Sequence, residues 1–373
     1  MIILSEVSLA TNGQLFAEFI LCQLTFLVAY KYFMMGSNSK WPWLLLLIVC
    51  LTYIWDTDYY SYMIDYVNGL ETTGNKEKLY YYLCQITTPY YIIFRLIIWG
   101  TAILLYYHTC KRLEIQPYVG IYVLICFFLT LFAYGRVNLA MTLYYCGFSY
   151  LIKPGNNKIL SYIFGIIVLS SSFFAHRSFL PVIVLTPLFF IPLNKVTISL
   201  LFLSTPLITL AIKYLFSGFL NESIQMDSSF ESFQSSAERA VNSGFEERNW
   251  KSLAMIAVRN YSFYIPCIYI LFKLFISRSR IYIEEYLKPL VMCISVIIII
   301  SICLQYGLDS FETGTMAKRY LFMSGIGECL LLSNLYTNCN INESILNRLI
   351  FLGFAVMEGN FLITYALHGY NIQ

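Results

Sequence analysis

Long apolar runs separated by short polar segments recur along almost the whole chain. A helix of about 20 apolar residues is long enough to cross the hydrocarbon core of a bilayer. The pattern predicts about twelve such spans, several of them short, over residues 13–33, 41–55, 89–107, 118–134, 136–152, 159–175, 177–193, 196–215, 253–276, 289–306, 317–336 and 345–366. The chain is therefore predicted to be an all-α polytopic membrane protein, with residues 1–373 forming a single integral membrane domain.

Composition supports lipid as the main solvent. Of the 373 residues, 58 % are hydrophobic and only 12 % are charged, whereas soluble domains carry about 25 % charged residues. The net charge of +3 and the lack of a basic stripe with interleaved aromatics exclude nucleic acid as a partner. No Walker motif or nucleotide fingerprint occurs, which excludes an ATP-driven pump.

The eleven cysteines predict packing rather than chemistry. Most fall inside predicted spans, where Cys behaves as a small apolar residue. Cys84 is the one placed in an outside loop, so we expect no disulfide. There is no C-x-x-C and no Cys/His ligand spacing, so we expect no metal site.

Lys and Arg in short loops set the orientation, because cytoplasmic loops carry the excess of positive charge. One alternating set of loops holds Lys31, Lys40, Lys111, Arg112, Lys153, Lys158, Lys195, Arg278, Arg280, Lys288 and Arg348. The opposite set is acidic or long, and comprises residues 56–77, 216–252 and 309–312. The first set is expected in the cytoplasm, which leaves both termini on the outer side.

Residues 216–252 form the one sizeable hydrophilic segment. Ser228-x-x-Glu231 is a capping box, and apolar residues follow at helical spacing up to Gly244. The pattern predicts an amphipathic helix on the outer face. It is either a structural cap or a lid over an acceptor site, with Arg239, Arg248 and Lys251 as polar contacts.

Charged side chains from distant parts of the chain fall at the predicted outer boundary: Asp56, Asp58, Arg136, His176, Arg177, Lys318 and Arg319. A closed bundle would bring them to one outer cavity. An outward-facing Arg136 in a tight turn suits an anion such as a lipid-linked phosphate, although it could also snorkel to water. Lys318 and Arg319 suit an anionic headgroup, and simple anchoring is the alternative.

Two of these positions could transfer a proton. His176 titrates near neutral pH and can act as a general base. Asp58 shares one helical face with Tyr62 and Tyr66 at i, i+4 and i+8. Asp56-Thr57-Asp58 is also a D-x-D sequence, which by itself is a weak sign of a divalent cation. The simpler interpretation is an acidic, solvated helix start.

The ordered set of these motifs resembles the EpsG-like group of Wzy-type polysaccharide polymerases, over roughly residues 45–335. The motifs are Asp58-xxx-Tyr62, Arg136-x-x-Leu139-Ala140, Ala175-His176-x-Ser178 and Arg319-Tyr320. The resemblance implies a bacterial inner-membrane glycosyltransferase that polymerises O-antigen, as in lipopolysaccharide biosynthesis, or exopolysaccharide. It implies an active site that faces the periplasm and an architecture similar to the multi-helix GT-C glycosyltransferases.

The resemblance also implies the partners and the residue roles. The substrate would be an undecaprenyl-pyrophosphate-linked oligosaccharide in membrane lipid, with a chain-length regulator as a further partner and no cofactor or metal. Arg136 and Arg319 would hold the pyrophosphate, with His176 as the first choice of base and Asp58 as the second. The substrate-binding residues would be Arg177, Lys318, Tyr62, Tyr66, Tyr320 and Arg248.

A lipid-linked oligosaccharide flippase or other transporter is the rival class. It should show repeat symmetry and charges near the midplane, whereas this chain concentrates charge at the outer boundary and shows no repeat. An O-antigen ligase-like enzyme or an acyltransferase would carry similar outer-face Arg and His residues. The sequence favours the polymerase.

Overall fold

The computed structural model describes residues 12–52, 66, 78–88, 90–132, 137–221, 265, 267–275, 283–307 and 314–338, with a few helical residues between 344 and 355. Every regular element in this part of the chain is a helix, which confirms the predicted all-α class. The chain divides into two compact units, Met1–Ile183 with Cys329–Gln373, and Val184–Glu328. Each unit is described by itself.

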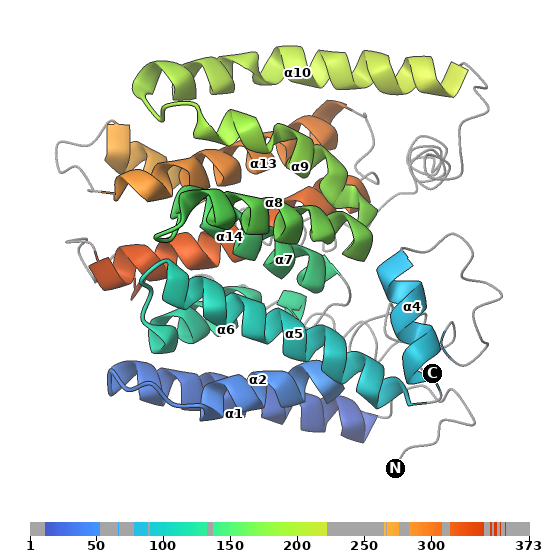
Figure 1. Cartoon of the computed structure of the whole chain (residues 1–373), viewed down its shortest axis with the longest axis vertical. Coiled ribbons are helices and arrows are strands. Elements are labelled where there is room, and N and C mark those ends of the chain that lie inside the picture. Colours follow the sequence, from blue (N-terminus) through green and yellow to red (C-terminus); the bar gives the residue numbers. More distant parts are fainter. Residues whose placement is uncertain are drawn as a thin grey trace. The chain divides into compact units, whose positions relative to one another are not determined.

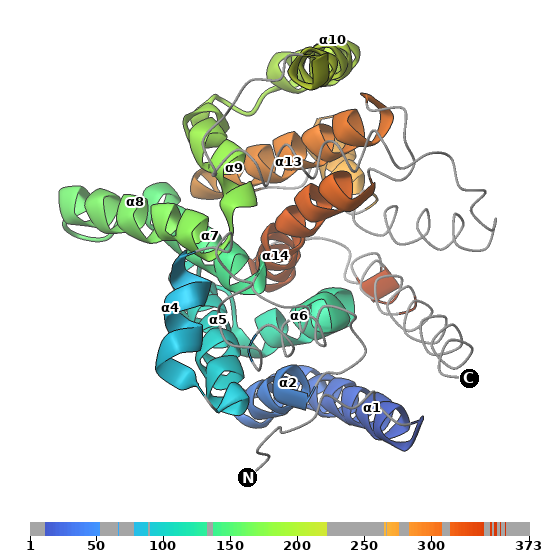
Figure 2. The same cartoon turned by 90° about the vertical axis from the view of Figure 1, so that its right-hand side faces the viewer.

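The first unit contains most of the described helices. In chain order they are α1 (Asn12–Met34), α2 (Trp41–Thr52), α4 (Lys78–Thr87), α5 (Tyr91–Arg112), α6 (Pro117–Phe132), α7 (Val137–Ile152) and α8 (Lys158–Ala175), followed by the 3₁₀ turn η2 (Arg177–Phe179) and the start of α9 (Leu180–Leu185). Successive long helices run in opposite directions, and short connections join them (Figure 1). Figure 2 shows α7 packed between α5 and α8.

The second unit holds the rest of α9, η3 (Thr186–Phe190), α10 (Lys195–Asn221), η4 (Glu285–Leu287) and α13 (Lys288–Gly307). α14 (Gly314–Asn338) begins in this unit and ends in the first. Within the second unit α13 packs against α10 and η3. The Sγ of Cys303 contacts the carbonyl oxygen of Thr205 at 3.5 Å, which joins α13 to α10.

Within the described part of the chain, four helices are long and apolar enough to cross a membrane: Phe16–Met34, Tyr91–Arg112, Lys158–Ala175 and Glu285–Leu304. Shorter apolar helices coincide with other predicted spans, over Trp41–Thr52, Pro117–Phe127, Val137–Ile152, Arg177–Phe190 and Lys195–Ala211. The expected spans thus correspond to helices wherever the chain is described. This architecture is that of a multi-pass membrane protein.

Two regions differ from the simple span pattern. The predicted span 177–193 is broken into η2, α9 and η3, because Pro187 lacks an N–H and cannot donate the α-helical hydrogen bond to the preceding turn.

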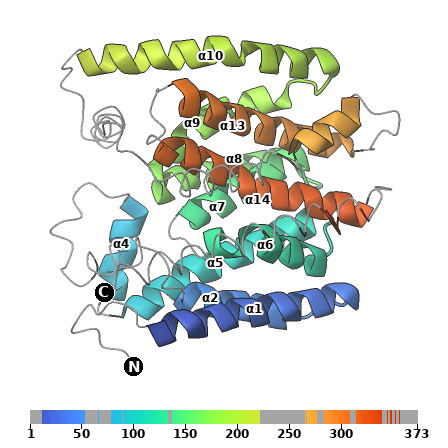
Figure 3. The same ribbon diagram turned by 180° about the vertical axis from the view of Figure 1, so that it is seen from behind.

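The first outer loop contains α4, which the sequence pattern did not predict. Tyr80, Cys84 and Thr87 form the buried stripe of α4, which packs on α5 and α8 at a steep angle to α5 (Figures 1 and 3).

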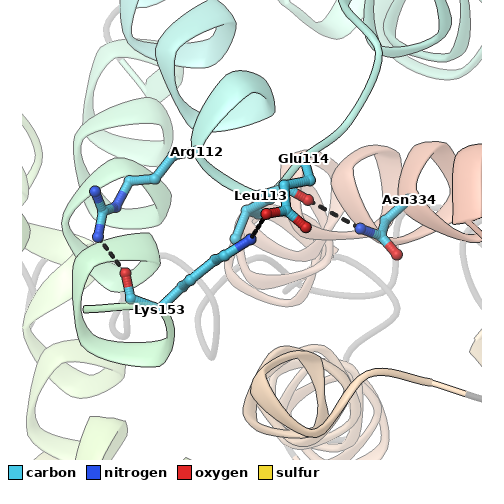
Figure 4. Close-up of polar contacts among 5 residues, drawn as sticks. All are labelled: Arg112, Leu113, Glu114, Lys153 and Asn334. Carbon is cyan, nitrogen blue, oxygen red and sulfur yellow. Dashed lines mark hydrogen bonds and ion pairs between the residues drawn. The ribbon is translucent and has the colours of Figure 1, made fainter. Parts of the chain in front are cut away.

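The predicted cytoplasmic loops of the first unit meet at one end, which we call the inner end: residues 35–40, 113–116 and 153–157. Asn38 Oδ1 accepts from the backbone N–H of Tyr118 at 3.2 Å. Arg112 donates to the carbonyl of Lys153, and the Nζ of Lys153 lies 2.7 Å from Glu114 (Figure 4). Asn334 near the end of α14 donates to the carbonyl of Leu113 at 3.0 Å. Loops that the charge pattern assigned to one side therefore lie together.

The connection after α5 has an unusual residue at its tightest point. Glu114 has a φ of 59°, a conformation that costs a non-glycine residue about 1–2 kcal/mol. The N–H groups of Glu114 and Ile115 bond to the carbonyls of Lys111 and Cys110, the pattern of a Schellman cap. α1 ends in the same way with Gly36 at the left-handed position. The conformation of Glu114 aims its carboxylate at Lys153.

The backbones of α7 and α8 approach each other closely. A Cβ added to Gly147 would lie 2.4 Å from the backbone N of Leu169 and 2.6 Å from the carbonyl oxygen of Gly165. Small residues allow such an approach in membrane bundles. Because these neighbours are backbone atoms, a side chain at position 147 can be accommodated only by moving one helix.

Replacing Gly147 with Ala is therefore expected to lower the free energy of unfolding by about 1–3 kcal/mol through overpacking. Gly100→Ala is the matched control, because a Cβ there meets nothing within 4 Å, and better helix propensity should give a gain of up to about 1 kcal/mol. Thermal unfolding of the purified proteins in one detergent measures both effects. Equal midpoints for the two variants would contradict the packing argument.

Candidate functional site

His176 terminates α8 and begins the next turn. Its backbone is extended (φ −159°, ψ 115°), and its N–H donates to the carbonyl of Ser172 at 2.9 Å. The side chain is 8 % exposed. Its Nδ1 accepts the backbone N–H of Ser178 at 3.3 Å and contacts the hydroxyl of Ser178 at 2.5 Å. The Ala175-His176-x-Ser178 motif is thus a local cap in which the ring and the serine are bonded.

This cap determines which ring nitrogen of His176 carries the proton. A backbone N–H can only donate, so Nδ1 acts as an acceptor and the neutral imidazole bears its hydrogen on Nε2. A proton added at Nδ1 would oppose the N–H of Ser178. In this arrangement the Nε2–H of the ring is a hydrogen-bond donor.

Arg177 follows directly and is half-buried. Its Nη1 is shielded from solvent and has no hydrogen-bond partner among the described residues. Phe179 closes the same turn with no exposed surface and packs on the ring of Tyr144 in α7, with 5.8 Å between centroids. Arg177 is therefore a cationic residue on a turn that is fixed by the His176 cap before it and by the packing of Phe179 after it.

Tyr66 lies in an aromatic cluster rather than on an open surface. It is 5 % exposed, and its hydroxyl donates to Thr87 Oγ1 of α4 at 3.0 Å. The ring lies 5.2 Å from that of Tyr91 and 5.8 Å from that of Phe94. Burial raises the pKa of the Tyr66 phenol, which keeps the hydroxyl a donor. Tyr66 is therefore bonded to α4 and packed on α5.

α14 carries three of the predicted residues in its first two turns. Tyr320 is 5 % exposed, and Lys318 and Arg319 precede it in the helix, with side chains outside the described residues. Arg319 lies about 22 Å along the helix axis from Asn334, at 1.5 Å per residue. Lys318 and Arg319 therefore lie near one end of α14, and Asn334 lies near the other end.

The remaining predicted site residues lie outside the described residues: Asp56, Asp58, Tyr62, Arg136, Arg239, Arg248 and Lys251, together with the amphipathic helix expected between 228 and 244. Their chain attachments are described in two cases. Asp56 and Asp58 follow the end of α2 at Thr52, and Arg136 directly precedes α7 at Val137.

In the first unit, these attachments share one end with His176. The end of α2, the start of α7 and the end of α8 lie opposite the inner end (Figures 1 and 3), and we call this the outer end. Among the described residues no cluster of three or more His, Cys, Asp or Glu side chains could hold a metal ion. The ten cysteines of the described part, Cys84 included, are buried and free of disulfides, as expected.

The family model of the EpsG family matches residues 43–371 of the chain. The protein belongs to the EpsG family. The match includes all four motifs that carried the resemblance, from Asp58 to Tyr320. No curated protein and no solved structure matches the chain. EpsG membership and the apolar helices identify a membrane protein of polysaccharide biosynthesis, with a polymerase-type glycosyltransferase function.

Sequence reasoning missed three features near the outer end. They are α4 and the buried polar side chains of Trp99 and Asn138, each at most 2 % exposed. The stripe of Tyr80, Cys84 and Thr87 at i, i+4 and i+7 could have revealed α4. An Asn inside a predicted span is likewise a signal, because a polar group at that depth needs a partner.

Proposed function

We propose that this EpsG-family protein is a polymerase that joins undecaprenyl-pyrophosphate-linked repeat units of O-antigen or exopolysaccharide. The reaction takes place at the periplasmic face of the bacterial inner membrane, in a bundle similar to the GT-C glycosyltransferases. One observation carries the proposal: the end of α2, which precedes Asp58 in the chain, the start of α7 directly after Arg136, and the end of α8 at His176 share the outer end, opposite the basic loops.

The chemistry suits such a site. The acceptor hydroxyl oxygen bonds to the anomeric carbon of the growing glycan, while the bond from that carbon to the pyrophosphate breaks. The hydroxyl proton passes to a base, and the electron pair stays on undecaprenyl pyrophosphate. Cations that hold the departing charge stabilise this transition state. Arg136 and Arg319 take that role, with Arg177 and Lys318 as further contacts.

The cap at His176 bears on the choice of base. With Nδ1 engaged by Ser178, His176 offers its Nε2–H, which suits a phosphate or sugar oxygen. Asp58 then becomes the proton acceptor, a role worth roughly 10²–10⁴ in rate. This reverses the order of the two candidates reached from sequence. Tyr62, Tyr66, Tyr320 and Arg248 complete the proposed substrate-binding set.

The role of His176 can be tested with amide side chains. A Gln amide N–H reaches the position of Nε2, so His176→Gln should retain about a tenth of wild-type polymerisation, whereas His176→Ala should lose on the order of 10²-fold, the cost of one lost donor. The measurement is the initial rate of glycan extension in membranes with matched protein levels. If His176→Gln is as inactive as His176→Ala, His176 is the base.

The cationic roles predict the cellular product. Arg136→Ala or Arg319→Ala should abolish long-chain glycan, because the departing pyrophosphate loses a partner, while the protein still inserts in the membrane. The surface-glycan ladder on a gel, with immunoblotting for the protein, measures both. Normal chain lengths in either variant would refute that residue's assignment. Loss of even the single capped repeat in a deletion strain would indicate a flippase or ligase instead.

A further inference from the structure

A buried arginine connects α5 to the end of α2. Arg95 lies in the second turn of α5 and is 3 % exposed. Its Nη2 donates to the carbonyl of Cys50, and the guanidinium lies 4.3 Å from the ring centroid of Trp99. Glu18 of α1, 4 % exposed, interacts electrostatically with it. An arginine inside a bilayer is costly, so these contacts compensate a side chain that does not face water.

One helical turn further along α5, Trp99 bonds to the end of α6. Its Nε1 donates to the carbonyl of Phe132 at 3.2 Å. Asn138 in the first turn of α7 donates through Nδ2 to the same carbonyl. Phe132 is the last residue of α6, and the final carbonyls of a helix lack an intrahelical donor. Two buried side chains thus fix where α6 ends and α7 begins.

These bonds lie next to the segments assigned to catalysis. Cys50 is in the last turn of α2, whose end leads to Asp56 and Asp58. Phe132 and Asn138 stand on either side of Arg136 in the chain. Arg95 and Trp99 are one turn apart on α5 and touch each other. A single buried contact set therefore reaches the attachment points of both segments.

We propose that Arg95, Trp99 and Asn138 form a positioning network that fixes the last turn of α2, the end of α6 and the start of α7 through the Cys50 and Phe132 carbonyls, and so fixes where the segments that carry Asp58 and Arg136 are attached. The inference rests on the proposed function. Each of the three side chains is at most 3 % exposed, so none contacts substrate; they act through the main chain. A displacement of about 1 Å in a reacting group can cost on the order of 10²-fold in rate.

α5 supplies a matched control for Trp99. Tyr106 donates through its hydroxyl to the carbonyl of Gly120 at 3.1 Å, also buried and also joining α5 to α6, but near the inner end. Trp99→Phe and Tyr106→Phe each remove one donor and retain an aromatic ring. A purely structural network would respond equally to the two changes, whereas a positioning network responds at Trp99 alone.

The first measurement is the kcat and KM of purified protein on lipid-linked repeat units extracted from cells that lack it. Trp99→Phe should lower kcat by about 10-fold with KM within about twofold, as expected for misplaced reacting groups. Tyr106→Phe should leave both unchanged. The double variant Trp99→Phe/Asn138→Ala should lose more than the product of the single losses, because the Phe132 carbonyl then has neither donor. Equal falls in kcat for Trp99→Phe and Tyr106→Phe would overturn the network.

A second measurement does not depend on activity. In an Arg136→Cys background, a membrane-impermeant maleimide reports how position 136 is presented, and the described native cysteines are buried. Adding Trp99→Phe should change the alkylation rate at least about threefold, because the Phe132 carbonyl next to this segment loses one hydrogen-bond donor, whereas adding Tyr106→Phe should not. An unchanged rate with Trp99→Phe would refute the network. An inactive wild-type protein would refute only the proposed function.

Discussion

The need to satisfy polar groups inside lipid governs this structure. The bilayer core offers no water, so backbone carbonyls at helix ends and buried polar side chains must find partners in the protein. The protein repeatedly meets this need in one way, by placing a buried side-chain donor on a main-chain carbonyl of another helix or loop. Arg95, Trp99, Tyr106 and Asn334 all make such bonds. The bonds of Arg95, Trp99 and Asn334 are made to carbonyls in or next to the last turn of a helix, so the same requirement bears on where the loops begin.

The two ends of the first unit use these bonds differently. At the inner end, Arg112, Lys153 and Asn334 join two loops and α14 around a strained Glu114, so the basic side chains of Arg112 and Lys153 make internal contacts. At the outer end, Trp99 and Asn138 donate to the carbonyl of Phe132, and the His176–Arg177 turn is capped locally.

Much of this architecture could be predicted from the sequence, because it depends on the length of apolar runs and the distribution of Lys and Arg. The spans, the shared side of the basic loops and the free cysteines follow from those properties alone. The break at Pro187 and the helix α4 were less accessible, since a short amphipathic helix inside an acidic loop gives a weak signal. The four motif segments were identified in chain order. The sequence carried no information on how deeply their residues are buried or on which contacts hold them in place.

Pairings between distant residues could not be predicted from one sequence. The residue types alone do not indicate that Trp99 and Asn138 share the Phe132 carbonyl. They also do not indicate that Arg95 on α5 donates to the carbonyl of Cys50 on α2. The proton position on His176 likewise depends on the backbone angles that bring the N–H of Ser178 to Nδ1. These details decide which residue donates and which accepts, so they alter the mechanism although they leave the family unchanged.

The most direct test of the polymerase is reconstitution of the purified protein in lipid nanodiscs. The only substrate supplied would be undecaprenyl-pyrophosphate-linked single repeat units, without nucleotide sugars. The account predicts a series of products that differ by one repeat unit, with one undecaprenyl pyrophosphate released for each bond formed. Single repeats that remain unextended, while the same preparation transfers them to another acceptor or across the bilayer, would contradict it.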